Sequence, residues 1–140
     1  MEKDMEIKMI KNDIFPPKGY KAITILPFIF HRVVLAWFDV NHEMIHVRQQ
    51  AEMLVVGIVL ALVLVTAGFG LWSLLAVPIY FWWYVIEYLI RLALYGNHRE
   101  AYRNISTEQE AYNNEKDDAY LDRRRHFAWL AYITKKSYNR

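Results

Sequence analysis

Charged and apolar residues are distributed very unevenly along the 140-residue chain. Between positions 53 and 86 there is no Asp, Glu, Lys, Arg or His, and a Gly-Phe-Gly break at 68–70 lies near the middle of this stretch. A soluble surface cannot stay uncharged over such a length, whereas two apolar arms joined by a glycine break can lie in a membrane. The pattern predicts a transmembrane helical hairpin. A hairpin buried in the core of a soluble oligomer is the alternative.

The segment 1–38, ahead of the apolar stretch, is expected to contain the β-structure. Its first dozen residues predict a short polar strand or lead-in, and residues 16–19 (PPKG) predict a turn. Tyr20–Phe30 is rich in β-branched and aromatic residues and predicts one strand, in which Pro27 favours a sheet edge or a bulge.

A long helix is predicted over 39–67. Asp39 or Asn41 can cap its start, and its polar first half continues directly into the first apolar arm. The second apolar arm is predicted as one helix over 71–95, with Pro78 near its start.

The last segment, 96–140, is polar and predicted to be helical. Ser106 or Thr107 can cap a helix that runs from Glu108 to about Leu121. A short final helix is expected from Arg123 to Tyr132, with Phe127, Trp129 and Leu130 as its apolar side.

Charge beside the apolar arms predicts the orientation of the chain in the membrane. Basic residues occur on both sides of the hairpin, and the 68–70 loop has no charge. By the positive-inside rule, both termini and the residues just before the hairpin are expected in the cytoplasm of a bacterium, at its inner membrane. Arg123–Arg125 are interpreted as lipid-headgroup or topology determinants. Glu87 and Arg91, four residues apart, are expected to form an ion pair at the membrane interface.

Composition narrows the classes of function. A chain of this length fits a single domain, 1–140. There is no cysteine, which excludes disulfides and cysteine-ligated zinc, and the net charge of +2 is too small to indicate nucleic-acid binding.

The residues that carry chemistry are His42-Glu43-Met44-Ile45-His46, an HExxH motif. Residues four apart lie on one face of a helix, so His42 and His46 can bind one Zn²⁺. Glu43 can reach a metal-bound water and act as its general base. The motif predicts a zinc site, and a catalytic zinc site needs a third protein ligand.

Three other histidines, His31, His98 and His126, are isolated and lack the spacing of an extended motif. An acid in the segment 106–112 (STEQEAY) is the better candidate for the third ligand.

Here the chain resembles the gluzincin metallopeptidases, in which a Glu on a later helix completes the HExxH site. In several membrane-embedded branches of that clan, the ligand Glu is followed by a small residue at the third position and Asp or Asn at the fourth. Glu108 has Ala111 at its third position, and Glu110 has Asn114 at its fourth. The resemblance implies a Glu ligand; we favour Glu108 and keep Glu110 as the alternative.

A second resemblance covers half to three quarters of the chain. HExxHxRQQ at 42–50, the apolar hairpin at 53–95, AYRNIS at 101–106 and ExEAYxNE at 108–115 are similar to a family of small, largely uncharacterised bacterial membrane proteins. This resemblance implies a shared fold more strongly than an activity.

These observations predict a mainly α protein: a transmembrane hairpin with a zincin-like HExxH helix, a C-terminal helical segment and a small N-terminal β element. The expected function is zinc-dependent hydrolysis of a peptide or protein substrate beside the lipid bilayer. Tyr112, His126 or Arg103 could stabilise the oxyanion, and Glu115, Asp117 or Asp118 could orient the histidines. An extended peptide could pair with the edge of the 20–30 strand.

Two other functions stay open. One is a non-catalytic integral membrane protein with a structural or regulatory zinc site. The other is an interaction module in which the motif is accidental.

Overall fold

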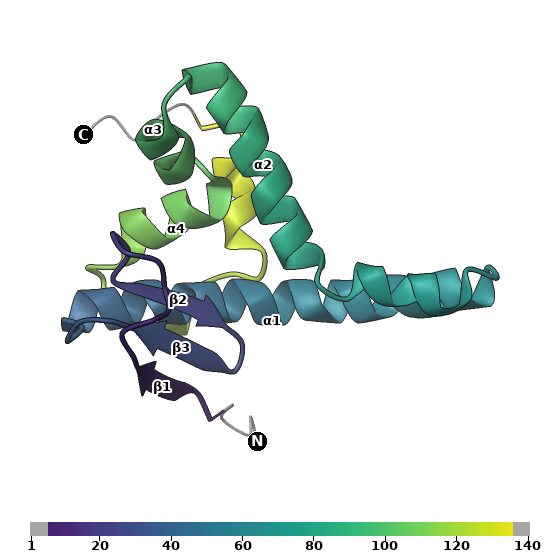
Figure 1. Ribbon diagram of the computed structural model, residues 1–140, viewed down its shortest axis with the longest axis horizontal. Helices are drawn as coiled ribbons and strands as arrows, with labels where there is room; N and C mark the ends of the chain where they lie inside the picture. Colours follow the sequence, from purple (N-terminus) through teal and green to yellow (C-terminus); the bar gives the residue numbers. More distant parts are fainter. Residues whose placement is uncertain (1–5, 136–140) are drawn as a thin grey trace.

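The computed structural model describes residues 6–135, and this part of the chain is mainly helical with one small sheet (Figure 1). Its longest element is helix α1, Trp37–Thr66, whose 30 residues extend over about 45 Å. The backbone N–H of Ala36, just before the helix, donates to the Asp39 carboxylate at 2.9 Å. Asp39 and Asn41 had been expected as possible N-caps, but both lie inside the helix and the N-cap is Ala36. Asp39 stabilises the first turn from within it.

The sheet has three strands, β1 (Lys8–Lys11), β2 (Ala22–Ile25) and β3 (Phe28–His31), in the order β1-β3-β2. β1 pairs with β3 in parallel, and β2 pairs with β3 antiparallel. The prediction of one strand over Tyr20–Phe30 is wrong, because the chain turns at Leu26-Pro27. Proline has no N–H for a ladder and fits a turn better than a strand interior. β2 is consequently an edge strand beside α1.

The second apolar arm is not one helix. It consists of a 3₁₀ helix, η1 (Gly70–Ala76), and helix α2 (Ile79–Tyr95), and the two are bent by 61°. Pro78 directly precedes α2; without an N–H it interrupts the ladder of helical hydrogen bonds and separates the two pieces. The prediction of a continuous helix over 71–95 is wrong at this point.

The 3₁₀ helix η1 lies against the second half of α1 at very short range. A Cβ on Gly57 would lie 2.5 Å from the carbonyl oxygen of Val77 and 2.6 Å from that of Ala76. The absence of a side chain at Gly57 permits this approach. Figure 1 shows this end of α1, with the returning chain beside it, projecting from the rest of the molecule.

Helix α3 (His98–Arg103) is capped by Asn97, whose side chain accepts from the N–H of Arg99. Three short helices follow: α4 (Ser106–Asn114), α5 (Tyr120–Arg123) and the 3₁₀ helix η2 (Ala128–Tyr132). The predicted helix 108–121 is therefore shorter and starts earlier than expected. The final predicted helix over 123–132 forms only at its two ends.

The expected caps of α4 are also wrong. Ile105 is the N-cap, and the Ser106 hydroxyl donates to the Glu87 carboxylate at 2.6 Å.

The helices and the sheet surround the first half of α1. The sheet lies on one side of it, α4 lies on another, and α2 rises away from its middle (Figure 1). A small core of Met53, Tyr80 and Trp129 joins α1, α2 and η2. Trp129 and Leu130 were both predicted on the apolar side of the final helix. Trp129 is buried, whereas Leu130 is half exposed.

Candidate metal centre

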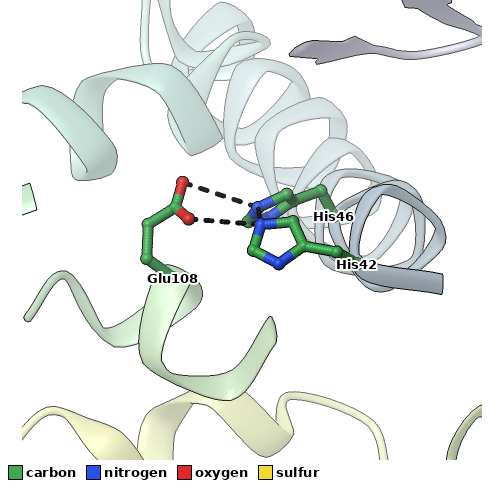
Figure 2. Close-up of side chains that lie close together, drawn as sticks. All are labelled: His42, His46 and Glu108. Atoms are coloured by element: carbon green, nitrogen blue, oxygen red, sulfur yellow. Dashed lines mark hydrogen bonds and ion pairs between the residues drawn. The ribbon is translucent and has the colours of Figure 1, made fainter. Parts of the chain in front are cut away.

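Three side chains from two helices meet at one point. His42 and His46 are one turn apart on α1, and Glu108 lies in the first turn of α4. Figure 2 shows the two rings and the carboxylate pointing toward one another. The His42 and His46 Nε2 atoms are 3.2 Å apart; Glu108 Oε2 lies 3.4 Å from the former and Glu108 Oε1 lies 3.5 Å from the latter. All three residues are buried, and together they could hold a metal ion.

The other nitrogen of each ring already has a hydrogen-bond partner. His42 Nδ1 lies 2.9 Å from Glu115 Oε2, and His46 Nδ1 lies 2.8 Å from Gln49 Oε1. The Gln49 amide can face only one way, since its Nε2 donates to the Thr107 carbonyl and to a carboxylate of Glu110, both at 3.0 Å. Both partners of the rings are therefore acceptors, and each Nδ1 must carry the proton.

It follows that each ring directs its Nε2 at the same point. Burial would lower the pKa of both rings, but the Glu108 carboxylate holds it above the usual value, and a bound metal ion would take the place of the proton on Nε2. The Glu108 carboxylate directs its oxygens there too, and its buried Oε2 accepts no hydrogen bond within the described chain. Converging acceptors repel one another unless a cation lies between them. Tetrahedral Zn²⁺ at about 2.0–2.1 Å from each donor needs donor separations of about 3.3–3.4 Å. The two Nε2 atoms, 3.2 Å apart, are close to that requirement, and each has an oxygen of Glu108 at 3.4 or 3.5 Å.

Burial and charge act in opposite directions on Glu108. Burial would raise the pKa of its carboxyl, but the neighbouring His46 and His42 lower that pKa below its usual range. Nearby, burial and the Glu108 charge raise the pKa of the Tyr112 phenol to about 12. Glu108 is thus held as a carboxylate, the form that binds a metal, and Tyr112 keeps its proton as a donor.

Glu43, the predicted general base, is buried beside the triad. Its Oε2 accepts a 2.6 Å hydrogen bond from the Thr24 hydroxyl on β2. This bond links the edge strand β2 to helix α1. Glu43 also lies in the walls of two hollows that meet at the site.

The structure brings Glu108, and not Glu110, to the histidines. The Glu110 carboxylate faces Gln49 and accepts from the Tyr120 hydroxyl at 2.9 Å and from the Arg124 guanidinium. Arg124 also pairs with Glu52 at 2.6 Å and is almost fully buried. Arg124 therefore bridges two internal carboxylates, those of Glu52 and Glu110, which corrects the interpretation of this residue as a lipid-headgroup contact.

Of the three candidates for oxyanion stabilisation, two lie near the metal group and one does not. The Tyr112 ring packs on His42 with 4.6 Å between centroids, and the Arg103 guanidinium lies 5.2 Å from the centre of the Tyr112 ring. Both residues line one of the two hollows. The His126 side chain is 93% exposed and contacts Glu52, so it lies outside the site.

The remaining histidines and acids are also placed. His98 contacts the hydroxyls of Tyr20 and Tyr88 and lines both hollows, while His31 contacts the carbonyl of Val33. Of the three acids expected to orient the histidines, Glu115 contacts His42. Asp117 pairs with Arg123, and Asp118 is exposed.

The hydrogen bonds by which α2 holds Glu108 and the start of α4 were not predicted. The Tyr84 hydroxyl donates to Glu108 Oε1 at 2.8 Å. Glu87 accepts from the N–H and hydroxyl of Ser106, at the start of α4, as well as from Trp83 and Arg91. The expected Glu87–Arg91 pair forms at 3.0 Å, but it is buried, and Arg91 also donates to the Ile133 carbonyl. Gln49 was likewise missed, although its position three residues after His46 could have indicated it.

The two hollows differ in chemistry. One, of about 450 Å³, has His46, Glu43 and Glu108 in a wall that is otherwise mainly aromatic and apolar. The other, of about 690 Å³, has His42 and Glu43 in a wall rich in charged residues. Glu43 therefore lies where an apolar space and a polar space join.

Comparison of the chain with protein-family models, with curated proteins and with solved structures finds no match.

Proposed function

We propose that this protein is a zinc-dependent hydrolase that cleaves peptide bonds at the surface of a membrane. The observation that carries the proposal is the convergence of three acceptors, His42 Nε2, His46 Nε2 and Glu108, beside the buried carboxylate of Glu43. Two imidazoles and one carboxylate match the donors of catalytic zinc sites, which keep a fourth position open. A structural site would have all four positions filled by protein.

His42, His46 and Glu108 would hold the ion. When bound, Zn²⁺ lowers the pKa of a water molecule and polarises the scissile carbonyl. Glu43 takes the proton from the attacking water and delivers it to the leaving amine as the C–N bond breaks, so that the hydroxyl ends on the acyl carbon. Thr24 orients Glu43, and Tyr112 is placed to donate to the developing oxyanion.

The second half of α1 supports a location in a bilayer. Arg48 is the last exposed charged residue of this helix, and Thr66 follows it by 18 positions, which corresponds to about 27 Å. This length is close to the roughly 30 Å of a bilayer's hydrocarbon core. Val55, Leu62 and Val63 are each more than half exposed along it. A soluble protein seldom leaves such a surface uncovered.

A second set of exposed apolar side chains continues this surface. Leu71 and Trp72 of η1 are 84% and 76% exposed, and Val85 and Ile86 of α2 are about half exposed. We propose that α1 crosses the membrane and that the bent η1–α2 arm returns to the same side, which places the metal centre at the cytoplasmic boundary. The predicted positions of the termini concern residues 1–5 and 136–140, which lie outside the described residues.

Metal analysis and peptide hydrolysis by purified His46→Ala and Glu43→Gln variants test the proposal. His46→Ala should lose stoichiometric zinc, because one of three ligands is gone. Glu43→Gln should retain zinc, because Glu43 is not a ligand. Hydrolysis should fall by about 100-fold or more in both variants.

The outcomes separate the alternatives. If His46→Ala retains as much zinc as the wild type, the metal site is wrong. If Glu43→Gln retains full function, the zinc is structural or regulatory, and the protein is not this hydrolase.

A further inference from the structure

We infer that the substrate of this site is a membrane-protein segment with a large apolar side chain on one side of the scissile bond and an acidic side chain on the other. The inference rests on the proposed peptidase function and adds the class of substrate. It comes from the two hollows that meet at Glu43.

The smaller hollow presents ring surfaces. Four aromatic residues of α2 line it, together with prolines and Ile23: Tyr80, Phe81, Tyr84 and Tyr88. The hydroxyl of Tyr84 is occupied by Glu108, and that of Tyr88 by His98. No Lys, Arg or Asp lies in the described wall. An apolar side chain is therefore the group that gains most by entering this space.

The larger hollow carries an excess of positive charge. Its wall contains four basic residues, Lys18, Lys21, Arg99 and Arg103, and three carboxylates, Asp39, Glu43 and Glu115.

Each of those carboxylates already has a protein partner. Asp39 pairs with Lys21 at 2.8 Å, Glu115 contacts His42, and Glu43 accepts from Thr24. Among the described residues, neither Lys18 nor Arg99 forms an ion pair, so an acidic side chain is the complementary ligand for this hollow.

The edge strand β2 provides a path from one hollow to the other. Ala22 lies in the wall of both. Lys21 and Ile23 pair with β3, so the N–H and C=O of Ala22, between them, point away from the sheet. Further along this free edge, the Gln50 side chain already bonds the Thr24 carbonyl at 2.7 Å and the Leu26 N–H at 2.9 Å. An extended peptide can thus pair at Ala22 but not beyond Thr24.

The apolar hollow also borders the surface proposed to face lipid. Phe81 lines it and is 41% exposed, next to the exposed Trp82. A substrate chain that leaves the bilayer would present its last apolar residues to this hollow and its first acidic residues to the basic one. The order from apolar to polar matches the segment of a membrane protein where it emerges from the membrane, and the basic wall selects those segments whose first charged residue is acidic.

Cleavage of matched peptides by the full-length zinc-bound protein in detergent tests the inference. Four quenched fluorescent peptides, each made in both directions, would place Leu or Ser on one side of the scissile bond and Glu or Lys on the other. The Leu/Glu peptide should have a kcat/KM about tenfold or more above the peptides with Ser or with Lys, in one of the two directions.

Variants of the two walls should change one preference each. Phe81→Ala should reduce the preference for Leu over Ser, while Leu89→Ala, an exposed α2 residue outside the wall, should not. Lys18→Glu should reduce the preference for Glu over Lys, while Lys116→Glu, exposed and outside the wall, should not. Zinc content of each variant reports whether the site is intact.

The wild-type preferences decide the inference. Equal kcat/KM for all the peptides, a preference for Lys, or cleavage of acyl esters without cleavage of any peptide would overturn it. Zinc-dependent peptide cleavage without preference leaves the proposed function standing, whereas a zinc-loaded protein that cleaves no peptide contradicts that function itself.

Discussion

At the scale of single residues, the neighbours of the histidines matter as much as the histidines. Glu115 and Gln49 each accept from an Nδ1–H, which leaves both Nε2 lone pairs for a metal. Such partners fix the orientation and tautomer of the ring, and their removal typically lowers metal affinity by about 10- to 100-fold. Gln49 in turn is held by Thr107 and Glu110, so α4 supplies both Glu108, the third member of the candidate metal group, and the support for His46.

The two acids of α4 should behave differently when substituted. Glu108→Ala removes a ligand and should lower zinc affinity by more than about 100-fold, beyond the effect of losing a ligand's partner. Glu110→Gln should keep stoichiometric zinc but destabilise the protein by roughly 1–3 kcal/mol, because Arg124 keeps only one charged partner. Competition with a zinc chelator measures the first effect, and thermal unfolding in detergent measures the second. The reverse pattern would make Glu110 the ligand.

At the scale of elements, helix α2 has one face that contacts the rest of the protein and one that is exposed. Tyr80, Tyr84, Glu87 and Arg91 form one stripe at helical spacing that faces the site and the C-terminal segment. The opposite face is apolar and exposed. The bend before α2 lets this helix diverge from α1 and reach the start of α4, where Glu87 accepts from two groups of Ser106. A straight continuation of η1 would have stayed along α1.

Glu87→Ala should therefore affect both stability and the metal site. The change leaves the Arg91 charge buried without its carboxylate and the start of α4 without its acceptor, at a cost of roughly 3–5 kcal/mol. Zinc affinity should fall as well, since α4 carries Glu108. Thermal unfolding and chelator competition would measure the two effects.

The matched control is Glu100→Gln, at an exposed position on α3, which should change neither quantity. The double variant Glu87→Ala/Arg91→Met should recover part of the stability, because no uncompensated charge remains buried. If Glu87→Ala unfolds like the wild type, α2 does not hold α4 in the way described.

At the scale of the whole molecule, the chain has a body and a projection. The body contains the sheet, the C-terminal helices and the first half of α1; the projection consists of the second half of α1 with η1 (Figure 1). Its exposed side chains are almost all apolar. A bilayer would cover them, and the same bilayer would bring the site close to substrates that emerge from it.

Cysteine labelling can test this arrangement cleanly, because the chain has no native cysteine. In native membranes, a charged maleimide should label Arg48→Cys from the cytoplasmic side and Phe69→Cys from the opposite side. Val59→Cys, between them on α1, should be protected by lipid and react at least about tenfold more slowly. Detergent solubilisation should abolish that difference. Equal labelling of Val59→Cys and Arg48→Cys in membranes would contradict a spanning α1.

Features that depend on neighbours along the chain could be predicted from the amino-acid pattern alone. The spacing of His42 and His46 places them on one helical face whatever the rest of the protein does, and the uncharged stretch 53–86 requires an apolar environment. A mainly helical fold with a small β element, and a group of zinc-type donors, followed from these local patterns.

Contacts between residues far apart in the sequence could not be predicted in this way. Glu108 and Glu110 lie two positions apart on one helix, so they point in different directions, and only the packing of α4 on α1 shows which one reaches the histidines. Packing likewise made Arg124 an internal partner and Gln49 a support of His46. Helical and strand periodicity encodes contacts within a turn or a strand, whereas contacts across some 60 residues depend on how whole elements fit together.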